Sequence, residues 1–175
     1  IENYFQDGRQ WGASIDYLRE KKALGTAGAL SSLEESLGHP IIVMNGDLLT
    51  KLNFRSLLEF HQDHDALITM CVREYDFQVP YGVVEINGSF ATALDEKPLH
   101  KFFVNAGVYV INPEVLTSIP ENTFHNMTDV ISPLLEKKNV VSFPIHEYWI
   151  DIGNLEDYHK ARGDYEEVFG QQALQ

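Results

Sequence analysis

The sequence predicts an α/β fold built around a mixed sheet. An unbroken apolar run, Pro40-Ile41-Ile42-Val43-Met44, ends abruptly at Asn45-Gly46-Asp47 and is typical of a strand buried on both faces of a parallel sheet. The pair Asn87-Gly88, which lies between two strand-like runs, predicts an antiparallel hairpin. Strands that alternate with helices early in the chain, followed by antiparallel signals, together indicate a mixed sheet.

Length and composition fit one globular domain. The chain has 175 residues, 44% of them hydrophobic, and we find no repeats and no linker. No apolar run is long enough for a membrane span, and the first residues do not resemble a signal peptide. The single Cys71 cannot form an internal disulfide, so we expect a cytoplasmic protein.

The charge of the chain restricts its partners. The formal net charge is −13, and so acidic a surface repels phosphate backbones, so we expect no nucleic-acid partner. If the substrates are themselves anions, the site must supply local positive charge. A divalent cation held by carboxylates is one way to supply it.

The first half of the chain predicts alternating strands and helices. Residues 13–18 alternate and predict a short strand. Thr26 is expected to cap a helix over residues 27–37, and Asn53 a helix that continues to about His64. Residues 66–72 predict the next strand.

The second half predicts the hairpin and the last helices. Asn112-Pro113 begins a short helix in the preferred cap-then-proline order, and Asn154 caps the final helix. The remaining elements are strands at residues 82–86, 90–94, 103–111, 140–143 and 147–150, and a helix over about 128–137.

Asp47 and Asp151 are the candidate metal ligands. Asp47 directly follows the apolar run at 40–44, and open α/β sheets bind ligands at the carboxyl ends of their strands. Asp151 lies between Ile150 and Ile152 at the end of a short strand, where a carboxylate is either paired or bound to a cation. Each has a simpler interpretation, a polar turn for Asp47 and a turn or cap for Asp151. The pattern alone does not decide between them.

Two further segments are candidates for ligand binding. In Glu96-Lys97-Pro98 the proline is expected to hold Lys97 in an extended conformation, and a fixed ammonium group suits a phosphate oxygen. A solvated ion pair in a loop is the simpler interpretation. In residues 24–28, Gly25 and Gly28 flank Thr26 before a predicted helix, which allows backbone amides to meet a ligand or simply gives a tight helix entry.

Other reactive side chains fit structural roles better. His61 and His64 lack a third metal ligand, and Cys71 has no basic neighbour in the sequence. There is no Gly-x-Ser-x-Gly segment, which argues against an α/β-hydrolase.

Six motifs in a fixed order resemble the sugar-1-phosphate nucleotidyltransferase family, from near residue 1 to about Ala161. They are Leu24-Gly25-Thr26-Ala27-Gly28-Ala29-Leu30, Val43-Met44-Asn45-Gly46-Asp47, Tyr81-Gly82-Val83-Val84, Glu96-Lys97-Pro98, Asn105-Ala106-Gly107-Val108-Tyr109 and Trp149-Ile150-Asp151-Ile152-Gly153. The resemblance implies a Rossmann-like nucleotide-diphospho-sugar transferase fold with a mixed, mainly parallel sheet.

The resemblance also implies roles for individual residues. Asp47 and Asp151 would bind the catalytic Mg²⁺, and Lys97 would meet the phosphate of the sugar 1-phosphate. A sugar-phosphate oxygen would attack the α-phosphorus of a nucleoside triphosphate and release pyrophosphate, a reaction that depends mainly on positioning and charge neutralisation. The nucleotide would be bound by Gly25, Thr26 and Gly28, and the sugar by Tyr81, Gly82, Glu96 and Asn105.

The form of the motifs favours particular nucleotide and sugar substrates. One motif of the family is missing. Leu24-Gly25-Thr26-Ala27-Gly28 resembles guanylyltransferases, so GTP is favoured, and residues 103–153 resemble bacterial members that activate amino sugars for surface glycans. The family's Gly-rich loop with its Arg and Pro-Lys pair has no match. We therefore expect residues 1–175 to be the C-terminal part of a catalytic domain that lacks its first strands, is inactive alone, and self-associates or exchanges strands through an exposed sheet edge.

Two other functions remain open. Glycosyltransferases of the related fold hold a metal with an Asp-x-Asp motif, but here Asp47 is followed by Leu48-Leu49. A non-catalytic module that senses nucleotide sugars would also fit the missing loop.

Overall fold

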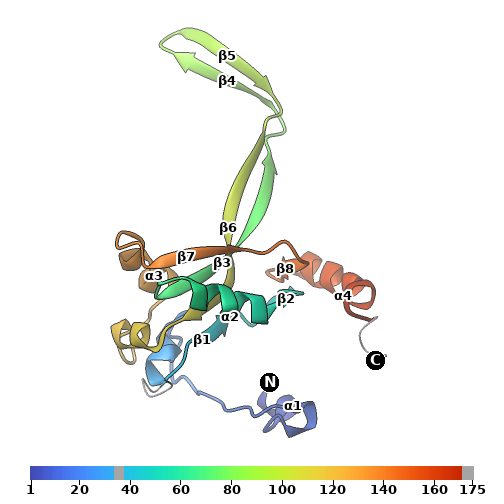
Figure 1. The fold of residues 1–175 in the computed structure, drawn as a ribbon. Coiled ribbons are helices and arrows are strands. Elements are labelled where there is room, and N and C mark those ends of the chain that lie inside the picture. Colours follow the sequence, from blue (N-terminus) through green and yellow to red (C-terminus); the bar gives the residue numbers. More distant parts are fainter. Residues whose placement is uncertain (34–37, 171–175) are drawn as a thin grey trace. The chain divides into compact units, whose positions relative to one another are not determined.

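The structure, a computed structural model, describes residues 1–33 and 38–170 (Figure 1). These residues form two compact units, the first from Ile1–Pro40 and Asn112–Lys137, and the second from Ile41–Ile111 and Lys138–Gln175. None of the helices in the described part of the chain has the length and apolar character needed to cross a membrane.

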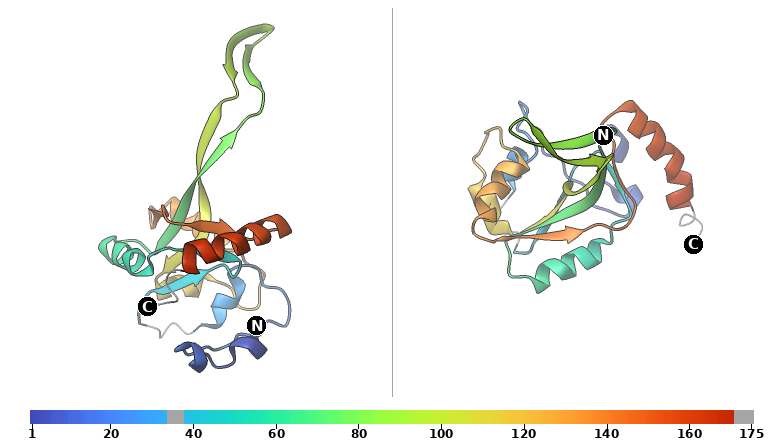
Figure 2. Two further views of the ribbon diagram at one scale, coloured as in Figure 1. Left: turned by 90° about the vertical axis from the view of Figure 1, so that its right-hand side faces the viewer. Right: turned by 90° about the horizontal axis from the view of Figure 1, so that it is seen from above.

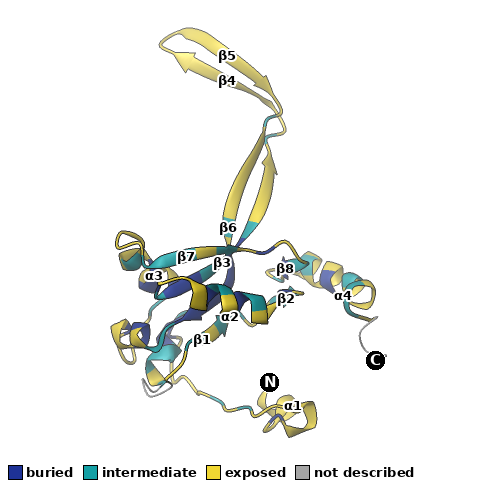
Figure 3. Ribbon diagram, viewed as in Figure 1, coloured by how far each residue is buried: buried dark blue, intermediate teal, exposed yellow. Residues whose placement is uncertain are grey.

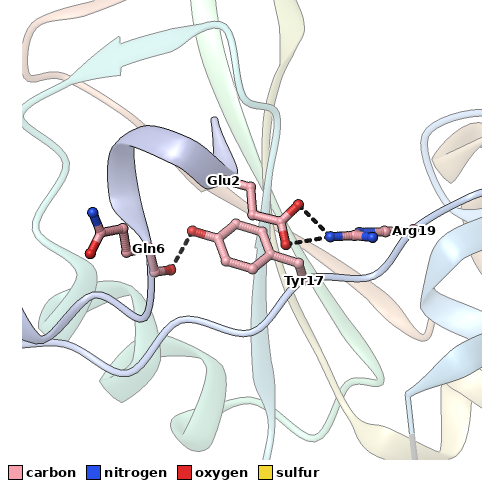
Figure 4. Close-up of polar contacts among 4 residues, drawn as sticks. All are labelled: Glu2, Gln6, Tyr17 and Arg19. Atoms are coloured by element: carbon pink, nitrogen blue, oxygen red, sulfur yellow. Dashed lines mark hydrogen bonds and ion pairs between the residues drawn. The ribbon is translucent and has the colours of Figure 1, made fainter.

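The regular elements among the described residues of the first unit are all helices. They are α1 (Glu2–Phe5), the 3-10 helices η1 (Arg9–Trp11), η2 (Gly28–Ser32) and η4 (Pro113–Ser118), and α3 (Met127–Leu135). The predicted strand at residues 13–18 is wrong, because this segment finds no strand partner among the described residues and contacts α1 instead. Tyr17 donates a hydrogen bond of 2.6 Å to the carbonyl of Gln6, and Arg19 bonds both carboxylate oxygens of Glu2 at 2.7 and 2.8 Å (Figure 4).

The structure corrects two parts of the prediction of a helix over residues 27–37, namely the type of helix and the residue that caps it. It is the 3-10 helix η2, whose chain turns extended at Leu33; residues 34–37 lie outside the described residues. Thr26 does not cap it. The Thr26 hydroxyl instead accepts a hydrogen bond of 2.9 Å from the amide of Met127, at the start of α3. This hydrogen bond satisfies an amide of the first turn of α3 that has no partner within the helix.

The second unit contains every strand found among the described residues. Its elements are β1 (Ile41–Met44), β2 (Leu48–Thr50), α2 (Phe54–Asp63), β3 (Ile68–Gln78), β4 (Gly82–Asn87), β5 (Phe90–Glu96), β6 (Leu99–Ile111), β7 (Val140–Pro144), β8 (Trp149–Asp151) and α4 (Leu155–Phe169).

The main sheet is mixed, as predicted, with the strand order β1-β6-β3-β7. Within it β3 and β7 run parallel, whereas β6 is antiparallel to both β1 and β3. The expectation of a mainly parallel sheet is therefore not met by the described strands. Nor is β1 buried on both faces: it lies at the edge of the described sheet, with Ile42 and Met44 exposed by 37% and 38%.

Helix α2 covers one face of this sheet (Figure 2). Asn53 caps it as predicted, because its side-chain oxygen accepts from the amides of Arg55 and Ser56 at 3.1 Å. Leu57, fully buried, packs into the core cluster that joins α2 to β3 and β6. That cluster contains Leu52, Leu57, Cys71, Ala106, Val108, Val110 and Ile145.

Two two-stranded ribbons extend away from the main sheet, and both faces of each ribbon are exposed to solvent (Figure 3). One is the continuation of β3 and β6, in which Tyr75 pairs with Phe102; the other is the predicted hairpin β4–β5, which turns at Gly88 with φ +62°. Tyr75 and Phe102 are 53% and 52% exposed. A two-stranded ribbon without a packed face is marginally stable in water, so these apolar side chains need a covering surface.

One glycine fixes how β1 ends. Gly107 in β6 has φ +70°, and its carbonyl accepts a hydrogen bond of 2.9 Å from the amide of Asn45. A Cβ at position 107 would lie 2.8 Å from the side-chain nitrogen of Asn45. The turn at residues 45–47 therefore depends on the absence of a side chain at Gly107.

Gly107→Ala is expected to lower the free energy of unfolding by about 1–3 kcal/mol, because it adds a strained backbone conformation and a steric contact with Asn45. Urea denaturation followed by circular dichroism measures the change. Gly163→Ala is the matched control, since Gly163 lies inside α4 with open space around it and should gain up to about 1 kcal/mol. Equal effects of the two substitutions would contradict this account of Gly107.

Candidate functional site

The structure brings Asp47 and Asp151 together at the ends of β2 and β8. These two short strands pair antiparallel, with Leu48 opposite Asp151. Directly beyond the ladder, the amide of Ile152 donates to the carbonyl of Asp47 at 2.9 Å. The two aspartates are distant in sequence, and this pairing makes them neighbours.

Negative charge is crowded around Asp151. Burial and then the charges of Asp47 and Asp157 raise the pKa of the Asp151 carboxyl group above its usual value. A Cβ placed on Gly153 would lie 3.9 Å from a carboxylate oxygen of Asp151 and 3.9 Å from one of Asp157. Carboxylates that repel one another in this way provide a favourable place for a cation.

This donor set fits Mg²⁺ in one particular manner. No group of three or more His, Cys, Asp or Glu side chains within residues 1–33 and 38–170 is arranged to hold a metal ion. Mg²⁺ usually takes one or two carboxylates from the protein and completes its shell with water and substrate phosphates. Asp47 and Asp151 fit that arrangement, which requires a phosphate-bearing ligand beside them.

A groove of about 560 Å³ begins at Asp151 and also contains Asn105. The side chain of Asn105 is held in place, since its amide nitrogen donates to the Tyr109 hydroxyl at 2.6 Å and its oxygen accepts from the amide of Gly107 at 3.1 Å. Trp149 is held similarly, because its ring nitrogen donates to the carbonyl of Ala106 at 3.0 Å. The lining residues are Arg73, Glu74, Tyr75, Val104, Asn105, Trp149, Ile150, Asp151 and Lys160.

The other predicted sugar-binding residues meet at the base of the hairpin. Gly82 on β4 pairs with Glu96 on β5, and a Cβ at Gly82 would lie 2.9 Å from a carboxylate oxygen of Glu96. Tyr81, the residue before, is 74% exposed. Tyr81, Gly82 and Glu96 therefore form one group, and Asn105 belongs to the groove at Asp151.

The predicted extended conformation of Lys97 is wrong. Lys97 has φ +51°, in the left-handed region, although Pro98 follows it. The tight turn from β5 into β6 imposes this conformation, which is fixed by hydrogen bonds from the amide of Val79 to the Pro98 carbonyl (3.0 Å) and from the Gln78 side chain to the Lys97 carbonyl (3.4 Å). Such strain is typical of positions that the surrounding structure holds for a functional reason.

The glycine loop at residues 24–28 packs against residues 123–127 of the same unit. The amides of Ala27 and Gly28 both donate to the carbonyl of His125, at 2.9 and 3.1 Å. A Cβ at Gly25 would lie 2.6 Å from that carbonyl oxygen, and one at Gly28 2.7 Å from the carbonyl oxygen of Thr123. Close packing thus accounts for both glycines, and the nucleotide-binding role of Gly25, Thr26 and Gly28 stays a prediction.

Sequence reasoning missed Arg73, Tyr75 and Lys160 in the groove at Asp151. Arg73 and Tyr75 lie two positions apart on β3 and could have been placed on one face from the period of a strand. For Lys160 the available signal was the helical spacing of Asp157, Lys160 and Asp164 after the cap at Asn154.

Solved structures share this fold. A Bacillus anthracis protein described as a glucose-1-phosphate thymidylyltransferase and solved with sucrose has a TM-score of 0.69 at 21% identity, covering 93% of this chain and 69% of that one. HddC from Yersinia pseudotuberculosis complexed with GMP-PN has a TM-score of 0.63 at 23% identity, covering 93% of this chain and 74% of that one. The chain therefore shares the fold of these two proteins.

Sequence comparison defines the family. The nucleotidyl transferase family profile matches residues 1–168, so the chain belongs to this family. Mannose-1-phosphate guanyltransferase 2 of Candida glabrata is 31% identical over 167 residues, which are 90% of this chain and 46% of the relative. Mannose-1-phosphate guanyltransferase of Saccharomyces cerevisiae is 31% identical over 168 residues, again 90% of this chain and 46% of the relative. The chain thus spans about half the length of these curated relatives.

Asp151→Asn is expected to raise the melting temperature of the metal-free protein at neutral pH, because it removes a charge that the folded site disfavours. Since the folded-state pKa of Asp151 is raised, the destabilisation is complete above that pKa and disappears below the pKa of the unfolded chain. The difference between wild type and variant should therefore shrink as the pH falls. Thermal unfolding over a pH series measures it, with the exposed hairpin variant Asp95→Asn as control.

Added Mg²⁺ should then reverse the order of the two melting temperatures, so that the wild type becomes the more stable protein. It is expected to raise the melting temperature of the wild type and to leave that of Asp151→Asn nearly unchanged, because a ligand stabilises only the state that binds it. An equal response of both proteins to Mg²⁺ would contradict a metal site at Asp151.

Proposed function

We propose that the protein carrying this chain transfers a nucleoside monophosphate from a nucleoside triphosphate to a sugar 1-phosphate. The products are a nucleotide sugar and pyrophosphate. The observation that carries the proposal is the meeting of Asp47 and Asp151 beside a groove, in a chain that belongs to the nucleotidyl transferase family.

The proposed reaction needs positioning more than covalent chemistry. A phosphate oxygen of the sugar 1-phosphate forms a bond to the α-phosphorus, and the bond from that phosphorus to the bridging oxygen of the β-phosphate breaks, so that pyrophosphate leaves with the bonding electrons. Asp47 and Asp151 would hold Mg²⁺, which when bound supplies charge neutralisation at the phosphates. Phosphoryl transfer depends mainly on such placement and electrostatics.

The remaining predicted residues would orient the two substrates. Tyr81, Gly82 and Glu96 at the hairpin base would contact the sugar, and Lys97 its phosphate. The sugar would also meet Asn105, whose amide is already oriented by Tyr109. Gly25, Thr26 and Gly28 would contact the nucleotide, and these assignments remain proposals derived from the family resemblance.

GTP is the favoured nucleotide. The Leu24–Gly28 segment supports it, as do the names of the relatives, which are mannose-1-phosphate guanyltransferases. Mannose 1-phosphate is therefore the first sugar substrate to test, with an amino-hexose 1-phosphate as the alternative. We also expect the protein to be cytoplasmic, where both substrate classes are made.

In the intact protein, GTP with mannose 1-phosphate and Mg²⁺ is expected to release pyrophosphate, measured by a coupled assay. Asp47→Asn or Asp151→Asn should lower kcat by at least about 100-fold, because each removes charge that positions the phosphates. ATP, UTP and dTTP, together with glucose and amino-hexose 1-phosphates, define the specificity. Transfer of a sugar to an acceptor without pyrophosphate release would favour a glycosyltransferase, and binding of a nucleotide sugar without turnover would favour a sensor.

The exposed ribbon supports a proposal about self-association. Residues 1–175 on their own are expected to show a mass that rises with concentration in light scattering, because Tyr75 and Phe102 on the ribbon lack a covering surface among the described residues. Phe102→Lys should shift the population toward the single chain, whereas Asp95→Lys on the hairpin should not. A single-chain mass at every concentration would contradict this proposal.

A further inference from the structure

One face of α4 is turned toward β8 and the groove at Asp151. Asp157, in the first turn of the helix, lies close enough to Asp151 to raise the pKa of its carboxyl group. Asp164, further along the helix, accepts a hydrogen bond of 2.8 Å from the Tyr148 hydroxyl, just before β8. The hydrogen bond between Tyr148 and Asp164 thus fixes the orientation of this helix face, and Asp157 lies near Asp151 on the same face.

Lys160 lies on the same face, between Asp157 and Asp164. It is three residues after Asp157 and four before Asp164, which is the spacing of one helical stripe. It lines the groove together with Asn105, Trp149 and Asp151. Lys160 is therefore placed in the groove by the contacts of its neighbours.

The positive charge of Lys160 is available for a ligand. The Arg73 guanidinium, the other cation in the groove, donates to the carbonyls of Ile145 and Glu147 at 2.8 and 2.9 Å. Glu74 in the groove is neutralised by Lys101 at 2.7 Å. Within the described part of the chain, Lys160 forms no ion pair shorter than 4.0 Å.

We infer that Lys160 binds phosphate oxygens in the groove beside Asp151. This inference rests on the proposed function. An anionic ligand is otherwise disfavoured there, because the groove is lined by Asp151, which lies near the charges of Asp47 and Asp157, in a chain with a net charge of −13. The ammonium group of Lys160 offsets that repulsion and suits a phosphate, which it meets as a point charge.

A purely structural role for Lys160 predicts something different. As a surface partner of Asp157 and Asp164 on one helix, it would contribute only a few tenths of a kcal/mol to stability and nothing to ligand binding. Ligand affinity therefore separates the two roles, and stability does not.

The test compares Lys160→Met and Lys160→Arg with the control Arg162→Met in the intact protein. Arg162 is an exposed cation on the same helix that lines a different groove, with Leu48, Leu49 and Tyr165. The measurements are KM and kcat for mannose 1-phosphate and for GTP, and the Kd of inorganic pyrophosphate with Mg²⁺ by calorimetry. Circular dichroism confirms that every variant is folded.

Lys160→Met is expected to weaken at least one phosphate ligand by roughly 10- to 100-fold, the value of one charged hydrogen bond, with a smaller loss in kcat. Lys160→Arg should recover most of the affinity, and Arg162→Met should match the wild type. A selective rise in the KM of mannose 1-phosphate assigns the contact to the sugar phosphate, and a selective rise in the Kd of pyrophosphate assigns it to the leaving group.

The inference would be overturned if both Lys160→Met and Arg162→Met bound every ligand with wild-type affinity. Failure of the proposed function has a separate signature, because the wild type then releases no pyrophosphate with any substrate pair. In that case the calorimetric Kd of pyrophosphate still decides whether Lys160 binds phosphate.

Discussion

The short antiparallel pairing of β2 with β8 is the contact on which the candidate site depends. It joins segments that are far apart in the chain, and the hydrogen bond from the Ile152 amide to the Asp47 carbonyl brings Asp47 and Asp151 to neighbouring positions on the two strands. Burial and like charge make that arrangement unfavourable by itself, as the raised pKa of Asp151 indicates. This crowding of carboxylates at the ends of β2 and β8 is the reason for proposing a cation there.

The surroundings of the pair show how the chain supports it. Gly107, in the left-handed region, lets β6 approach Asn45 and so sets the turn that ends in Asp47. Asn154 caps α4, accepting from the amides of Glu156 and Asp157 at 2.8 and 3.0 Å, and so starts the helix with Asp157 near Asp151. The glycine and the helix cap are both local features, and both influence where carboxylates lie.

Local chemistry explains which features the sequence could predict. The caps at Asn53 and Asn154 and the turn at Asn87-Gly88 follow from side-chain and backbone preferences of a few neighbouring residues, and the structure confirms them. The predictions that β1 is buried on both faces and that Lys97 is extended were wrong, and the position of Lys160 in the groove was missed. Each of these features depends on which distant segment of the chain packs alongside. The convergence of Asp47 and Asp151 was accessible only through the order of six motifs, not through any of them alone.

Metal affinity measured in a double-mutant cycle tests most directly whether Asp47 and Asp151 hold one shared ion. Mn²⁺ binding to the intact protein, followed by electron paramagnetic resonance, can be compared for wild type, Asp47→Asn, Asp151→Asn and the double variant. The account predicts one site that either single substitution abolishes, with no further loss in the double variant. Losses that add independently, or one single variant that binds Mn²⁺ as tightly as the wild type, would contradict it.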